Sequence, residues 1–94
     1  MQCNSLDEVR ENIDRIDDEI IKLIAKRGNY VAQASAFKKD EKDVKSSKRV
    51  EAVIAKVKNK AIIYGVDPDL AEVLYKEMIS HFINMELNEF NKEK

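Results

Sequence analysis

Arg27 interrupts an apolar repeat that otherwise runs along a predicted helix over residues 6–37. Steps of three and four residues place the members of this repeat on one helical face. The repeat comprises Leu6, Val9, Ile13, Ile16, Ile20, Leu23, Arg27, Tyr30, Ala34 and Phe37. A guanidinium keeps its proton and is costly to bury without an anion. Because the repeat contains no acidic residue, we expect Arg27 to bind an anionic group from outside it.

Two more cations border the same face, since Arg10 and Lys38 each follow an apolar member of the repeat by one position. They are 28 residues apart, roughly 42 Å along a helix, so one chain cannot bring both to the same small ligand. Arg27 and Lys38 are 11 residues apart, roughly 16 Å, and their long side chains can extend toward a ligand between them. An antiparallel pair of chains would bring Arg10 of the partner subunit to that ligand.

Such a cationic site suits a compact molecule with more than one carboxylate, because arginine forms paired hydrogen bonds with carboxylates. Structural explanations for the same residues stay open. Arg10 can be a solvated helix residue, and Lys38 can complement the dipole at a helix end. Arg27 can form an ion pair within the protein, with Asp17 or Glu86 as its partner.

The composition indicates a single all-α domain over residues 1–94. Two glycines and one proline leave little room for the turns of an all-β fold, and 37% charged residues accompany many good helix formers. Seventeen basic and 18 acidic residues give a net charge of −1. This balance argues against a nucleic-acid or membrane-surface binder.

The single cysteine and the single histidine, Cys3 and His81, provide neither a disulfide framework nor metal-ligand spacing. We therefore expect no metal site, and a core-edge or surface position for His81. The first ten residues lack the apolar core of a signal peptide, and no apolar run approaches the roughly 20 residues that span a bilayer. These features predict a soluble cytoplasmic protein.

Capping residues delimit three helices, expected over residues 6–37, from 46 or 47 to 65, and from 67 to about 90. Asn4 or Ser5 can cap the first helix, and Gly65 can end the second. Asp67 is a good N-cap for the third, with Pro68 in its first position. Residues 39–45 are expected to form a loop or a frayed end, which can also order over a ligand. The second helix should turn Val50, Val53, Ile54, Val57, Ala61 and Tyr64 inward.

The first helix would be close to 50 Å long, well beyond the average, and two shorter helices cannot cover its apolar face. Homodimers with two-fold symmetry are the commonest oligomers. In an intertwined pair with antiparallel first helices, both apolar faces would be buried. We therefore expect an intertwined antiparallel homodimer with two equivalent sites, each built from both chains.

The run Val9-Arg10-Glu11-Asn12-Ile13-Asp14-Arg15-Ile16-Asp17, then Ala25-Lys26-Arg27 and Phe37-Lys38, resembles the first helix of the all-helical chorismate mutases. The similarity continues through the third helix. The chain looks nearest to a branch that includes the isochorismate-pyruvate lyases of salicylate biosynthesis. In that branch the loop after the lysine is short, as it is here, where Arg49 follows Lys38 by 11 residues.

This resemblance implies an intertwined three-helix homodimer that rearranges chorismate to prephenate without a cofactor. Arg27, and Arg10 of the partner subunit, would hold the two carboxylates of the substrate. Lys38 would contact a carboxylate and the ether oxygen whose bond to carbon breaks. Orientation of a folded conformer and preorganised electrostatics would then do most of the catalysis, with no general base.

The sequence departs from the family pattern at two positions. Glu86 stands where many members have a glutamine that donates to the ether oxygen, so it can take that role only while protonated. One hypothesis is a raised pKa at Glu86 and mutase activity that falls as pH rises; the alternative is an ionised Glu86 paired with Lys38 or Arg27. Lys48 stands where the mutases commonly have a glutamate for the ring hydroxyl.

The substrate-binding residues expected from the resemblance are Arg10, Arg27, Lys38, Ser47, Lys48 and Phe82, and Ser46 is an alternative to Ser47. The catalytic residues expected are Lys38 and Glu86. The leading functional expectation is chorismate mutase. The alternatives are an isochorismate-pyruvate lyase and a helical dimerisation or metabolite-sensing module that lacks catalysis.

Overall fold

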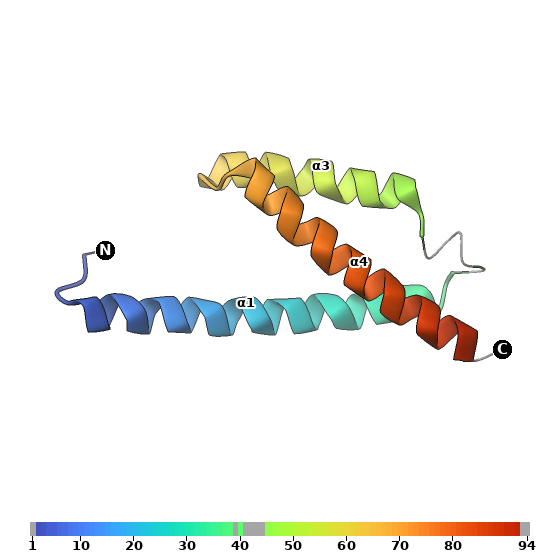
Figure 1. The fold of residues 1–94 in the computed structure, drawn as a ribbon, viewed down its shortest axis with the longest axis horizontal. Coiled ribbons are helices and arrows are strands. Elements are labelled where there is room, and N and C mark those ends of the chain that lie inside the picture. Colours follow the sequence, from blue (N-terminus) through green and yellow to red (C-terminus); the bar gives the residue numbers. More distant parts are fainter. Residues whose placement is uncertain (1, 39, 41–44, 93–94) are drawn as a thin grey trace. The chain divides into compact units, whose positions relative to one another are not determined.

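The structure, a computed structural model, describes residues 2–38, 40 and 45–92, except for the side chains of residues 90–92. Within these residues it contains three helices and no strand: α1 (Leu6–Ser35), α3 (Ser47–Tyr64) and α4 (Pro68–Lys92) (Figure 1). The all-α prediction is confirmed. Residues 39 and 41–44 of the expected loop, and the Phe90 side chain, lie outside the described part.

α1 begins with two side-chain caps that resemble a capping box, shifted by one residue at the Glu8 carboxylate. The Ser5 hydroxyl accepts a hydrogen bond from the Glu8 N–H at 3.1 Å, and the Glu8 carboxylate accepts one from the Asn4 N–H at 3.1 Å. Asp7 and Glu8 also place negative charge in the first turn, where the helix dipole favours it. Of the two caps predicted, Ser5 is therefore the one that satisfies an N–H inside the helix.

α1 ends at Ser35, two residues before the predicted end. The Phe37 N–H donates to the Ala34 carbonyl at 3.0 Å, and the Lys38 N–H donates to the Ser35 carbonyl at 3.2 Å. These bonds span three residues, so the chain tightens from α-helical into turn geometry. Phe37 and Lys38 consequently lie beyond the helix, and distances along a continuous helix do not apply to Lys38.

The apolar repeat of α1 is largely open to solvent in the single chain. Among its large side chains within the helix, exposed fractions range from 37% for Val9 to 72% for Tyr30. No residue of α1 is fully buried, whereas Arg27 in the middle of the repeat is partly buried. The chain divides after Gln33 into two compact units, and α1 makes up most of the first.

α3 and α4 form a helical hairpin inside the second unit (Figure 1). Ser46 caps α3 by accepting from the Arg49 N–H at 3.4 Å. Gly65 ends α3 in the left-handed region, with φ of 77°, and the Val66 N–H donates to the Ala61 carbonyl at 2.7 Å. Asp67 then accepts from the Asp69 N–H at 2.9 Å and opens α4. These limits confirm the predicted boundaries of both helices.

The apolar core of the hairpin is small. Ala61 is the one apolar residue classed as buried in the described part of the chain, at 6% exposure. Tyr64, predicted to point inward from α3, is 76% exposed, so that prediction is wrong for the single chain. Tyr64 is the last residue of α3, where the chain turns away. Across the described residues, no helix is long and apolar enough to cross a membrane.

Candidate functional site

Lys38 and Glu86 form an ion pair, with the Lys38 ammonium donating to Glu86 Oε2 at 2.8 Å. Lys38 lies just beyond the last turn of α1, and Glu86 lies near the end of α4. Glu86 is the buried charged residue of the described chain, at 9% exposure, and the Lys38 side chain is 24% exposed. The structure thus brings together the two residues predicted to be catalytic.

This pair leaves Lys38 with donors for a ligand. An ammonium has three N–H donors, and Glu86 occupies one of them. The carboxylate of Glu86 accepts a charge-assisted bond, which is the geometry expected for the ionised alternative at this position. A lysine held in this way by a carboxylate of low exposure has a defined orientation for its remaining donors.

Arg10 and Arg27 both lie in α1, within the first unit of the chain. They are 17 residues apart in the sequence, roughly 25 Å along the helix. Arg10 is exposed and Arg27 is partly buried. The structure therefore keeps these two arginines too far apart in one chain to bind one small ligand.

The two serines proposed for the site, Ser46 and Ser47, have different roles at the start of α3. The Ser46 hydroxyl accepts the capping bond from the Arg49 N–H, so part of its hydrogen-bonding capacity is used at the helix end. Ser47 and Lys48 are the first two residues of α3, and both are exposed. Ser47 is therefore the hydroxyl with more freedom to meet a ligand.

Phe82 lies one helical turn before Glu86 on α4 and is partly buried. Its ring meets the His81 ring edge to face, with centroids 6.3 Å apart and planes 82° apart. His81 is exposed, which confirms a surface position. The one-turn spacing puts Phe82 and Glu86 on the same side of α4.

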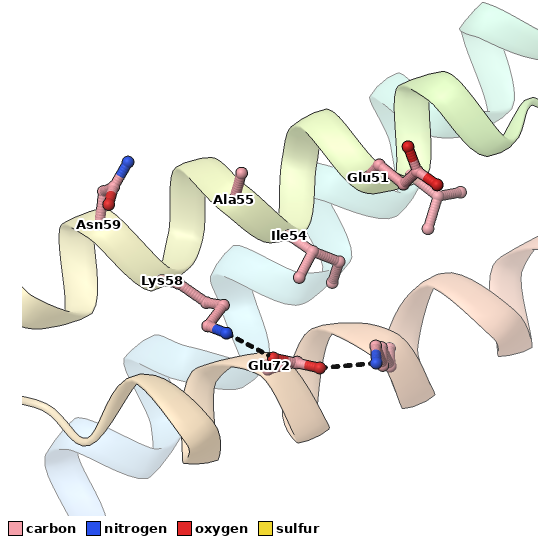
Figure 2. Close-up of a pocket in the computed structure, with 8 residues that line it drawn as sticks. Glu51, Ile54, Ala55, Lys58, Asn59 and Glu72 are labelled. Atoms are coloured by element: carbon pink, nitrogen blue, oxygen red, sulfur yellow. Dashed lines mark ion pairs between the residues drawn. The ribbon is translucent and has the colours of Figure 1, made fainter.

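A second charged cluster, formed by Lys58, Glu72 and Lys76, was not predicted from the sequence. Glu72 Oε1 accepts from Lys58 of α3 at 2.8 Å, and Oε2 accepts from Lys76 of α4 at 2.6 Å (Figure 2). The cluster borders an open cleft of about 490 Å³ between the two helices. The spacing of Glu72 and Lys76 by four residues is a helical ion-pair signal in the sequence, but nothing there indicates Lys58.

Charge pairing in this cluster shifts two pKa values. The hydrogen bond from Lys58, reinforced by the bond from Lys76, lowers the pKa of Glu72 to about 2. The same hydrogen bond with Glu72 raises the pKa of Lys58 above its ordinary value of 10.5. Lys58 and Glu72 are therefore both charged throughout the neutral range.

The fold and site define a class of small all-α protein with a lysine held by a nearly buried glutamate. A family model described as chorismate mutase type II matches residues 9–87, a span that includes both of these residues. The chain belongs to this family.

A relative named isochorismate pyruvate lyase, from Pseudomonas aeruginosa, is 35% identical over 81 residues. The alignment covers 86% of this chain and 80% of the relative. Family membership supports an activity of the chorismate mutase type, whereas the name of the relative refers to a different reaction. The resemblance inferred from the residues, to this family and to the branch with the lyases, is thereby confirmed.

Proposed function

We propose that the protein is a chorismate mutase, which rearranges chorismate to prephenate without a cofactor. The observation that carries the proposal is the Lys38–Glu86 pair, placed within the span that matches the family. A second N–H donor of Lys38 would contact the ether oxygen on which negative charge develops as its bond to carbon breaks. Stabilising that charge with a preoriented cation lowers the barrier without any proton transfer.

The proposed site needs a second chain. Arg27 and Lys38 of one chain would hold the substrate together with Arg10 of the partner subunit, because the roughly 25 Å between Arg10 and Arg27 excludes a one-chain arrangement. The exposed apolar repeat of α1 supports this assembly, since an apolar face of that length is typical of a helix that a partner covers. An antiparallel homodimer would bury two such faces and complete two sites.

The remaining residues would define how chorismate sits. Arg27 and Arg10 of the partner subunit would each bind a carboxylate, which fixes the folded conformer in which the reacting carbons approach. Ser47 or Lys48 would meet the ring hydroxyl, and Phe82 would cover an apolar part of the substrate. Glu86 would act through Lys38, whose position it sets.

An isochorismate-pyruvate lyase is the second candidate. The similarity to the relative of that name favours it, over 86% of this chain. The same cations can promote loss of pyruvate when the substrate hydroxyl sits at the other ring position. In both reactions the bond between the ring and the ether oxygen of the enolpyruvyl group breaks; the group migrates to another ring carbon in the mutase reaction and leaves as pyruvate in the lyase reaction. Lys38 would therefore have the same task, which is to stabilise charge on that oxygen.

One assay separates these candidates. Purified protein is incubated separately with chorismate and with isochorismate, and prephenate, salicylate and pyruvate are measured. Prephenate from chorismate supports the mutase, and salicylate with equimolar pyruvate from isochorismate supports the lyase. Lys38→Met is the control, since any product it still forms at the wild-type rate does not arise at the proposed site. If neither substrate reacts, both proposals are rejected and a module without catalysis is favoured.

A further inference from the structure

α4 carries two carboxylates, Glu72 and Glu86, that each pair with a lysine from another part of the chain. Both lie on nearly the same face of the helix. Glu72 lies in its second turn and Glu86 near its end, 14 residues later. At 3.6 residues per turn, 14 residues make almost four whole turns, so the two side chains differ in direction by only about 40° and are separated by roughly 21 Å. Because a helix turns as a rigid body, a rotation of α4 about its axis turns both carboxylates through the same angle, and their similar direction places both on one side of the helix.

Glu72 is tied to the neighbouring helix. Its Oε1 accepts from Lys58 of α3 at 2.8 Å, so this ion pair links the two arms of the hairpin. Its Oε2 accepts from Lys76 at 2.6 Å, a bond within α4 (Figure 2). Lys58 lies six residues before the end of α3 and Glu72 lies four residues after the start of α4, so the link is roughly one to two turns from the bend on each arm.

Apolar packing beside this link is loose. In the described part of the hairpin, Ala61 is the one buried apolar residue, and it lies nearer the bend than Lys58 does. Beyond the link the helices face an open cleft, whose apolar lining is Val50, Ile54 and Ala55. Partly exposed apolar side chains leave the rotation of a helix less well specified than a close-packed core does, whereas an ion pair with defined atoms restricts it.

We propose that Lys58 is a positioning residue, which fixes the rotation of α4 through Glu72 and so holds Glu86 against Lys38. Because Lys58 pairs with Glu72, roughly 21 Å along α4 from Glu86, it acts across the hairpin rather than at the reacting atoms. The effect of Lys58 on turnover rests on the proposed function, whereas its effect on the position of the Glu86 side chain is independent of that function.

The test compares Lys58→Met with Lys76→Met in the full chain. Both changes remove one of the two cations on Glu72, but only the first breaks the link between α3 and α4. The direct readout is the ¹³C resonance of the Glu86 carboxyl carbon, assigned by its loss in Glu86→Gln. Lys38→Met supplies the reference position for Glu86 without its ion pair.

We expect the Glu86 resonance to move toward the Lys38→Met position in Lys58→Met, to stay at the wild-type position in Lys76→Met, and to return in Lys58→Arg. Where a substrate is turned over, kcat should fall about tenfold in Lys58→Met with KM little changed, because a misplaced catalytic group affects the transition state more than binding. Lys58→Gln and far-ultraviolet circular dichroism check that the loss of charge leaves the helices formed.

A Glu86 resonance at the wild-type position in Lys58→Met would overturn the proposal, as would equal shifts in Lys58→Met and Lys76→Met. Loss of helix in both Lys58→Met and Lys58→Gln would also reject it, because the link would then be needed for folding rather than for placement. Absence of turnover with either substrate bears on the proposed function alone, since the resonance is measured without substrate.

Discussion

Lys38 and Glu86 are 48 residues apart in the sequence, and their charged atoms lie 2.8 Å apart in the structure. The lysine comes from the turn that follows α1, and the glutamate from the far end of α4. The Glu86 side chain is nearly buried, whereas the Lys38 side chain keeps about a quarter of its exposure. A nearly buried acceptor thus holds a donor on a partly exposed side chain, which is an arrangement suited to presenting a cation to a ligand.

Removing only one partner of the Lys38–Glu86 ion pair should destabilise the folded protein. Lys38→Met leaves the Glu86 carboxylate at low exposure without this partner, so we expect the free energy of unfolding to fall by about 1–3 kcal/mol. The double variant Lys38→Met/Glu86→Met should recover much of this loss, since apolar replacement of both partners removes the unpaired charge. Urea unfolding of the single and double variants measures both values. A double variant no more stable than Lys38→Met would contradict this expectation.

Replacing Glu86 by glutamine tests the charge at that position. The amide keeps the shape of the side chain, and it can donate to a substrate oxygen where an ionised carboxylate can only accept. For the proposed mutase reaction we expect kcat/KM at neutral pH to rise on the order of tenfold in Glu86→Gln, because the amide oxygen can still accept from Lys38 while a negative charge no longer opposes the oxyanion. Glu86→Ala is the control, and it should lose activity. Equal losses in the two variants would indicate that the carboxylate itself is needed.

A site shared by two chains predicts complementation. Arg10→Ala and Arg27→Ala should each be inactive as homodimers, but a heterodimer of the two would keep one of its two sites intact. Random exchange makes half of the dimers mixed, so the equimolar mixture should recover about a quarter of the wild-type activity. Kinetics after unfolding and joint refolding provide the measurement, with separately refolded variants as the control. A mixture without activity, despite mixed dimers seen by native mass spectrometry, would exclude the shared site.

Acid should weaken the link between α3 and α4. The pKa of Glu72 is about 2 in the folded chain against an ordinary value of 4.5, so the folded state favours the ionised form. A depressed pKa contributes stability that is present above pH 4.5 and is lost as the pH falls from there to about 2. Glu72→Gln should therefore be less stable than wild type at pH 7, and the difference should disappear near pH 2. Thermal unfolding across this range checks it, and a constant difference would contradict it.

Local chemistry made the helix boundaries predictable. Ser46, Gly65 and Asp67 each favour one backbone environment strongly enough to mark a helix end without tertiary information. The end of α1 was placed too late because residues 36–38 contain neither glycine nor proline, and the apolar repeat continues through Phe37. Periodicity alone does not register where the chain tightens into a turn.

The candidate site was predictable only in part. The repeat singled out Arg27, Arg10 and Lys38, because a cation on or beside an apolar face is unusual. Glu86 was first considered as a possible ion-pair partner of Arg27, and its place in the site came from the resemblance to the family. A pair with Lys38 or Arg27 was one of the two alternatives for its role. The Lys58–Glu72 link was not foreseen, since the rotation of one helix against another depends on packing that a single sequence does not specify.

The exposed repeat of α1 also bears on how the protein behaves when it is scarce. A chain that leaves Ile13, Ile16 and Leu23 half or more exposed lacks a core sufficient for the long helix on its own. In the proposed homodimer, the second chain that covers this face contributes binding free energy to folding, so the midpoint of thermal unfolding should depend on protein concentration. Dilution would then lower both the stability and the specific activity of the proposed enzyme, with every residue of the site unchanged.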